Sequence, residues 1–146
     1  MILFKKKRVE LGKGHINAYV IFESKYLFSI ILYNWKTIEQ NRFHTHAFSA
    51  IAFLLRGGYV EEKIIDRKIV INNVNNKFIP RYLPKNYCHR ILKAEPKTWT
   101  IIFVGPWIKY WYEYFQDSKK WVRYTWGRKK ISEYQGDETD IHFSKQ

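Results

Sequence analysis

The chain has 146 residues, the length of one domain, and 46% of them are hydrophobic, which supplies one core and excludes wholesale disorder. Its single cysteine, Cys88, excludes an internal disulfide framework and a cysteine-rich zinc module. With 26 Lys and Arg against 13 Asp and Glu, the net charge is +13, which favours anionic partners such as nucleic acid or acidic protein. Coding bias in an AT-rich genome is the alternative source of this lysine content.

The N-terminal residues carry neither a membrane span nor a secretory signal. Tyr26–Tyr33 is the longest apolar run near the start, and it is far shorter than the ~20 residues that a span needs. Residues 1–4 are apolar and precede the basic run 5–8, which reverses the order of a signal peptide. We therefore expect a single-domain protein that is soluble and cytoplasmic and has no membrane partner.

Short runs rich in β-branched and aromatic residues follow one another along most of the chain, separated by turn residues. They predict a short N-terminal extension strand and then eight strands: Asn17–Phe22, Tyr26–Tyr33, Arg42–Leu55, Tyr59–Ile65, Lys68–Ile71, Lys77–Tyr82, His89–Lys93 and Thr98–Val104. No long stretch has apolar residues at helical spacing. The fold class is therefore predicted to be all-β, an antiparallel sandwich or barrel with its core over 15–105.

The C-terminal third differs in composition, because nine aromatic residues lie from Trp107 to Trp126. We expect residues 106–134 to form a partly helical aromatic flap that packs on the outside of the barrel. An aromatic binding platform is the alternative for the same residues. Residues 135–146 are polar and predict a loosely held tail.

Three of the five histidines carry the strongest chemical signal. His44 and His46 have the i, i+2 spacing that places two imidazoles on one face of a strand, a geometry that suits a transition metal. His89 enters another strand just after a turn at 84–86, where proline sets φ and asparagine tolerates a left-handed conformation. His89 is therefore the candidate third ligand.

Taken together, these residues resemble the motifs of the cupin superfamily of small β-barrels. The first cupin motif, G-x5-H-x-H-x3–4-E-x6-G, is matched at His44, His46 and Gly58. The second, G-x5-P-x-G-x2-H-x3-N, is matched at Pro84 and His89. The resemblance implies a double-stranded β-helix, or jelly-roll, barrel, and it implies a homodimer formed through edge strands.

The departures from the cupin pattern define the kind of metal site. The usual glutamate ligand would fall at Ala50 or Ile51, and neither side chain binds metal. The three remaining histidines resemble the cysteine-dioxygenase branch of cupins, where three histidines hold ferrous iron without a carboxylate. The chain is also similar to small cupins of bacteriophage genomes, which implies a phage-encoded protein in a bacterial host.

A three-histidine site implies a particular chemistry. Neutral imidazoles leave the charge of a divalent metal uncompensated and leave coordination positions open, so the site would bind an anionic substrate. The resemblance implies Fe(II), and Zn(II), Mn(II) and Ni(II) are the other candidates. The alternatives are three satisfied core histidines or the remains of a lost site. The neighbouring Cys88 is expected to point to the opposite face and to pack there.

Six further residues are candidates for the pocket beside the histidines. Tyr59 and Glu61 share one face of a predicted strand and are candidate catalytic acid–base groups, and Glu61 is also an alternative ligand. Arginine fixes carboxylates and phosphates through two parallel hydrogen bonds. The candidate substrate-binding residues are Arg56, Arg81, Tyr87 and Arg90. A packing or surface role is the alternative for each of the six.

Three functions are compatible with these patterns. The first is a metal-dependent cupin enzyme of the oxygenase or isomerase type, acting on a small anionic substrate such as a nucleotide or sugar nucleotide. The second is a non-catalytic module that binds nucleic acid or a host protein through its basic, aromatic surface. The third is a metal-free sugar-nucleotide epimerase, for which Asp66 is the only aspartate in the predicted barrel.

Overall fold

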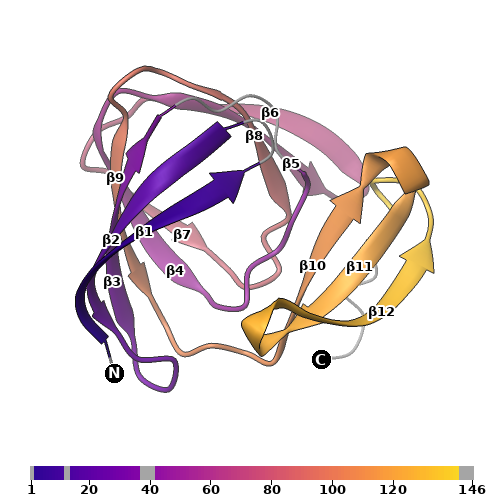
Figure 1. Cartoon of the computed structure of the whole chain (residues 1–146). Coiled ribbons are helices and arrows are strands. Elements are labelled where there is room, and N and C mark those ends of the chain that lie inside the picture. The colour runs from indigo at the N-terminus through magenta and orange to yellow at the C-terminus, as the bar shows by residue number, and fades with distance from the viewer. Residues whose placement is uncertain (1, 12–13, 37–41, 142–146) are drawn as a thin grey trace.

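The computed structural model describes residues 2–11, 14–36 and 42–141, and nearly all of its regular structure is β-strand (Figure 1). The strands are β1 (Ile2–Leu11), β2 (Gly14–Glu23), β3 (Ser29–Trp35), β4 (Ala50–Arg56), β5 (Tyr59–Ile65), β6 (Lys68–Val74), β7 (Pro80–Leu83), β8 (His89–Ala94), β9 (Trp99–Val104), β10 (Tyr110–Phe115), β11 (Lys120–Thr125) and β12 (Lys129–Gln135). No helix in the described part of the chain has the length and apolar character of a membrane span. The predicted all-β class is confirmed.

Two sheets curve around a common interior and form the barrel. The larger sheet has the strand order β1-β2-β3-β9-β4-β7, and the smaller has the order β6-β5-β8. Every pair of neighbouring strands in them is antiparallel. A third sheet, β10-β11-β12, lies beside the barrel, coloured orange to yellow in Figure 1.

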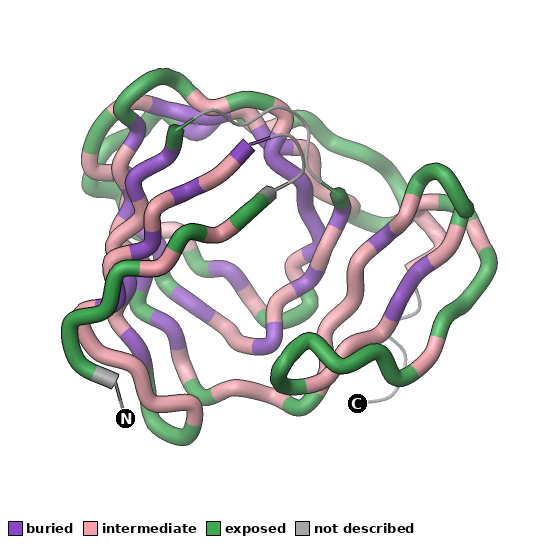
Figure 2. The backbone as a smooth tube through the Cα atoms, in the orientation of Figure 1, coloured by how far each residue is buried: buried purple, intermediate pink, exposed green. Residues whose placement is uncertain are grey.

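The interior is lined by alternate residues of the strands, as the period of two requires. On β2 the buried residues are Gly14, Ile16, Ala18 and Val20, and the residues between them are half-buried. Figure 2 shows buried positions alternating with half-buried ones along the barrel strands. Ala50 and Ala52 on β4 are also buried, and their small side chains leave space in the middle of the barrel.

The turn between β4 and β5 positions the strand that carries two candidate site residues. Gly57 has φ +73°, and a Cβ on it would lie 2.3 Å from Oγ1 of Thr98. The next amide, Gly58 N, donates to the same Oγ1 at 3.2 Å. Only glycine fits this turn, which directs Tyr59 and Glu61 into the barrel as β5 begins.

The C-terminal sheet corrects the prediction of a partly helical flap. Residues 106–134 contain β10, β11 and most of β12, and their helical structure is limited to two three-residue 3₁₀ turns, Gln116–Ser118 and Trp126–Arg128. Tyrosine, tryptophan and valine favour strands, and here they pair in register across β10 and β11. The sheet packs beside the barrel through Tyr114 and Trp121, as the predicted flap would.

Three further predictions of local structure were wrong. Residues 42–49 do not continue β4 as a strand, because their backbone bonds go to two different neighbours and not to one ladder. The tail is not loose as far as residue 141: Trp121 Nε1 donates to Asp137 O at 3.0 Å, and Glu138 lies 3.7 Å from Arg90. The N-terminal extension strand, β1, has ten residues and is not short. Residues 142–146 of the predicted tail lie outside the described residues.

Candidate metal centre

Three imidazoles converge inside the barrel. His44 and His46 come from the connection before β4, and His89 is the first residue of β8. One ring nitrogen from each of the three lies within 4.8 Å of the others. The Nε2 atoms of His46 and His89 are 3.0 Å apart. Two nitrogens that bind one metal at about 2.1 Å and at a right angle lie about 3.0 Å apart, so this spacing fits a shared ion.

Backbone hydrogen bonds bring the three rings together. His44 N donates to His89 O at 3.0 Å, and His89 N donates to His44 O at 3.1 Å. On the other side, Thr45 N donates to Tyr112 O at 2.9 Å. The segment is therefore extended although it belongs to no strand, and alternation places His44 and His46 on one side with ring centroids 5.1 Å apart.

The second ring nitrogens of two histidines are held by acceptors. His44 Nδ1 lies 2.9 Å from Arg42 O, and His89 Nδ1 lies 2.8 Å from Glu61 Oε2. A proton on each Nδ1 leaves the lone pair on Nε2, the atom that would bind a metal, and in His89 this atom is hydrogen-bonded to His46 Nε2 at 3.0 Å. Burial lowers the pKa of His44 to about 3 and holds that of His46 well below its usual value, and the neighbouring His89 lowers both further. Both rings are therefore neutral, the state that binds metal.

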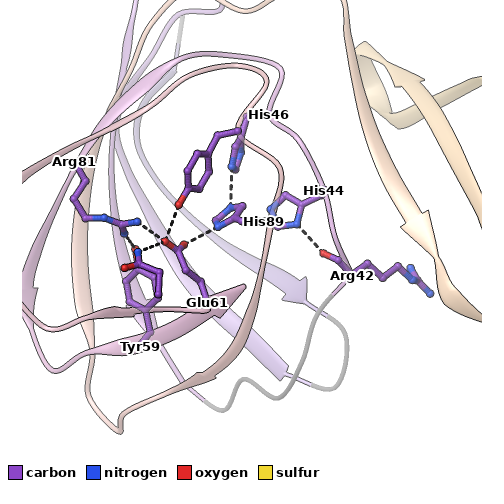
Figure 3. A network of polar contacts seen from close by, with 9 residues as sticks. Arg42, His44, His46, Tyr59, Glu61, Arg81 and His89 are labelled. Atoms are coloured by element: carbon purple, nitrogen blue, oxygen red, sulfur yellow. Dashed lines mark hydrogen bonds and ion pairs between the residues drawn. The ribbon is translucent and has the colours of Figure 1, made fainter. Parts of the chain in front are cut away.

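Glu61 lies at the centre of the polar network in Figure 3. Its side chain is 0% exposed, and Oε2 accepts the bond from His89. Its Oε1 accepts from Asn72 Nδ2 and Tyr87 OH, both at 2.8 Å, and from Arg81 Nη2. Burial would raise the pKa of Glu61, but the hydrogen bond from His89 and the charge of Arg81 outweigh it and lower the pKa to about 2. Glu61 is therefore an ionised carboxylate with both oxygens engaged.

Two tyrosines complete this network. Arg81 Nη1 donates to the hydroxyl oxygen of Tyr59, and the Tyr87 hydroxyl donates to Glu61. Burial raises the pKa of Tyr59 to about 12, although Arg81 opposes the shift. Burial and the negative charge of Glu61 also raise the pKa of Tyr87. Both phenols are therefore protonated at neutral pH, and Arg81 is held between Glu61 and Tyr59.

A cavity of about 220 Å³ opens beside the three histidines. Most of its wall is apolar, and the lining residues are Val9, Ile16, Tyr33, Trp35, His44, His46, Phe48, Ala52, Tyr59, Leu83, His89, Ile91, Thr100 and Ile102. Trp35 stacks on Tyr59 with centroids 5.0 Å apart, and its Nε1 donates to Thr100 Oγ1 at 2.9 Å. The cavity is smaller than the roughly 300–1,000 Å³ of pockets that hold drug-sized ligands.

No protein-family model matches the chain, and no curated protein matches it in sequence. Three solved structures resemble its fold. Oxalate decarboxylase from Bacillus subtilis has a TM-score of 0.53 at 14% identity, over 72% of this chain and 28% of that chain. HppE with Fe(II) and substrate has a TM-score of 0.55 at 9% identity, over 72% of this chain and 60% of that chain. KdgF from Halomonas sp. has a TM-score of 0.50 at 13% identity, over 72% of this chain and 94% of that chain.

The protein has the cupin fold. The predicted cupin-like barrel is thereby confirmed at the level of the fold. The chain spans 28% of the oxalate decarboxylase chain and 60% of the HppE chain, less than two thirds of each. Identities of this size establish the architecture alone, and the site must be argued from its own residues.

The cupin barrel brings four of the six candidate pocket residues to the histidines and places two elsewhere. Tyr59, Glu61, Arg81 and Tyr87 form the network described above. Arg56 is exposed at the end of β4. Arg90 points away from the cavity, where its Nε lies 2.6 Å from Glu62 and its guanidinium 4.3 Å from the ring of Phe43.

The structure also shows where Asp66 and Cys88, the two other residues considered in the sequence, lie relative to the histidines. Asp66 lies in the turn between β5 and β6, outside the network around His89. Cys88 packs against Phe43 and Trp121 beneath the C-terminal sheet, and burial raises the pKa of its thiol. Cys88 is therefore a packing residue, as expected.

Sequence reasoning missed three residues of the cavity wall. Tyr33, Trp35 and Thr100 come from β3 and β9 of the larger sheet. The alternation on β3 places Tyr33 and Trp35 on one face, so a signal existed in the sequence. That signal did not say which face is internal, because β3 has apolar or aromatic residues on both sides.

Proposed function

We propose that the protein is a metal-dependent cupin enzyme of the oxygenase or isomerase type that acts on a small anionic substrate. One observation carries the proposal: the imidazoles of His44, His46 and His89 converge on one side of a mostly apolar cavity. The second nitrogens of two of these imidazoles are held by a carboxylate and a backbone carbonyl. Such acceptors are the usual outer partners of metal-bound histidine.

Fe(II) is the metal that we propose, with Mn(II), Zn(II) and Ni(II) as the alternatives. Imidazole suits iron, zinc and nickel. Among the similar structures, HppE is described with Fe(II), and the oxalate decarboxylase of Bacillus subtilis is described with Mn(II) centres. When bound, the metal would supply a Lewis acid with open coordination positions beside the cavity.

The chain's own residues have distinct roles in this proposal. Glu61 acts as a positioning residue, because it holds the proton of His89 on Nδ1 and has no free oxygen for a substrate or a metal. Arg81 neutralises Glu61 and anchors Tyr59, so it is not the free anion clamp suggested by its residue type. Tyr59 reaches the cavity and is the candidate proton donor. The apolar walls exclude water from the site.

Metal content tests the proposal. The untagged protein is purified anaerobically, and Fe, Mn, Zn and Ni are quantified by mass spectrometry after reconstitution. We expect one metal per chain in the wild type and its loss in His44→Ala and His89→Ala. His15→Ala is the matched control, because His15 lies on β2 outside the three-histidine group and should keep the metal. Iron supports an oxygenase, and the other metals support an isomerase or hydrolase. A metal-free wild type, or retention in both site variants, would refute the proposal.

The basic surface supports a second candidate function. Exposed cations of the C-terminal sheet, Arg128, Lys129 and Lys130, lie near Trp126, whose ring is partly exposed. Cations beside aromatic rings favour single-stranded nucleic acid. This candidate predicts binding to a single-stranded oligonucleotide that weakens steeply with salt and persists in His89→Ala. Binding that His89→Ala abolishes would contradict it.

A further inference from the structure

The charges around the cavity restrict what it can hold. Within residues 2–11, 14–36 and 42–141, no aspartate, glutamate, lysine or arginine lines it. The nearest charged pair of the described network, Glu61 and Arg81, is satisfied internally: Glu61 also accepts from Asn72 and Tyr87. Among the described residues, a ligand in the cavity therefore faces no unpaired charged side chain, and the metal held by the three imidazoles is the charge it would meet.

One polar group on the opposite wall has no partner. Tyr33 lies on the inner face of β3, between the two apolar clusters of the barrel, while His89 belongs to the smaller sheet. Among the described residues, none forms a hydrogen bond with the Tyr33 hydroxyl, whereas the Trp35 N–H donates to Thr100. The Tyr59 hydroxyl oxygen accepts from Arg81, and its proton is the one assigned above to proton donation. Burial raises the pKa of Tyr33 to about 12, with a smaller contribution from Glu23, so its hydroxyl keeps its proton.

We propose that the substrate is a small, mainly apolar monoanion whose anionic group binds the metal and whose body carries one hydrogen-bond acceptor held by Tyr33. This inference rests on the proposed metal-dependent function and names its substrate class. A second charge on the ligand would be buried against apolar walls with no counter-charge, which is costly. The class therefore excludes nucleotides, sugar phosphates and amino-acid zwitterions.

The size of the cavity agrees with this class. A volume of about 220 Å³ corresponds to roughly seven water molecules at about 30 Å³ each. A single six-membered ring with a carboxylate is of this order, whereas a nucleotide is much larger. Ala52 contributes to the space because its buried side chain is small and lines the cavity.

A matched series of ligands tests charge at nearly constant shape. Isothermal titration calorimetry is performed on the metal-loaded protein with benzoate, 4-hydroxybenzoate, 3-hydroxybenzoate, terephthalate and 4-(aminomethyl)benzoate. We expect benzoate and the hydroxybenzoates to bind the loaded protein and not the metal-free protein. Terephthalate adds a second negative charge and 4-(aminomethyl)benzoate adds a positive one, and each should bind at least about tenfold more weakly than benzoate.

Two substitutions test the wall of the cavity. In the wild type, the hydroxybenzoate that reaches Tyr33 should bind about fivefold more tightly than benzoate, the effect of one hydrogen bond. Tyr33→Phe should remove this difference in affinity, and the affinity for benzoate, which has no group to accept the bond, should stay the same. Tyr82→Phe is the matched control, because Tyr82 is 66% exposed on β7 and absent from the cavity wall. Ala52→Leu should weaken benzoate binding by filling the cavity.

Metal content is measured on every sample, so the two proposals fail separately. A protein that takes up no metal refutes the proposed function and this inference with it. A metal-loaded protein that binds terephthalate or 4-(aminomethyl)benzoate as well as benzoate, or that binds none of the series, refutes the inference alone. The inference is also overturned where Tyr33→Phe leaves the hydroxybenzoate preference intact, or where Ala52→Leu keeps its metal and full benzoate affinity.

Discussion

Replacing Glu61 by glutamine tests the link between the polar network and the metal centre. Glu61 Oε1 faces three donors, from Asn72, Tyr87 and Arg81, and Oε2 faces His89 Nδ1 at 2.8 Å. A glutamine has one oxygen and one NH₂, so the oxygen would turn to the three donors and the NH₂ to His89. Nδ1 of His89 would then have to accept, which moves its proton to Nε2, the atom aimed at the metal.

We expect Glu61→Gln to lower metal affinity by about 10–100-fold, the usual effect of losing an outer partner of a metal-bound histidine. The variant should also unfold more easily, because the Arg81 guanidinium, 19% exposed, loses its ionic partner. Leaving a hydrogen-bonded charge unpaired costs about 1–3 kcal/mol, and partial solvation and the remaining contact with Tyr59 favour the lower end.

Metal affinity is measured by competition with a chromophoric chelator, and the tautomer of His89 is read from ¹⁵N NMR shifts of the metal-free protein. Glu62→Gln is the matched control, because the neighbouring Glu62 pairs with Arg90 outside the cavity and should leave the affinity unchanged. A Glu61→Gln variant that binds metal within about threefold of the wild type, or keeps the Nδ1–H tautomer, would refute the reasoning.

Three other predictions concern stability and reactivity. The pKa of His44 is about 3 in the folded protein and 6.5 in the unfolded chain. Below pH 6.5 the unfolded chain therefore binds one more proton at this group, and the free energy of unfolding of the metal-free protein should fall by about 1.4 kcal/mol per pH unit. Denaturant titrations at several pH values should show that the free energy of unfolding of His44→Gln depends less steeply on pH than that of the wild type. An equal dependence would contradict the lowered pKa of His44. Gly57→Ala should cost about 1–3 kcal/mol through its positive φ and its clash with Thr98, and more than Gly127→Ala, where φ is also positive but no atom lies within 4 Å. Cys88, which is buried with a raised pKa, should react with a thiol reagent only on unfolding, and rapid labelling of the native protein would contradict its packing role.

The class of the fold and the three histidines could be predicted from the amino-acid sequence alone. Both depend on local rules: β-branched and aromatic runs favour strands, and the i, i+2 spacing places two side chains on one side of an extended chain. That spacing held for His44 and His46 although their segment is a connection and not a strand, because alternation needs only extended backbone.

Only the tertiary structure decided what surrounds the histidines. Glu61 meets His89 because β5 pairs with β8 in the register Glu61–Ile91 and Lys63–His89, after a shift between Val60 and Glu61. A register and a shift of this kind join strands that are distant in the sequence, and no local pattern encodes them. The same holds for the C-terminal sheet, whose aromatic residues favour strands but do not say what they pack against.

The roles of the charged residues were also decided by partners and not by residue type. Arg81 is predicted by its chemistry to bind a substrate anion, but the fold places the Glu61 carboxylate against it, and the buried pair neutralises both. Arg90 was predicted for the same role, and the strand turns it outward to Glu62. The sequence shows which residues have reactive or charged side chains. Which of these side chains stay available to a ligand depends on contacts between distant parts of the chain, because burial and counter-charge act through space and not along the chain.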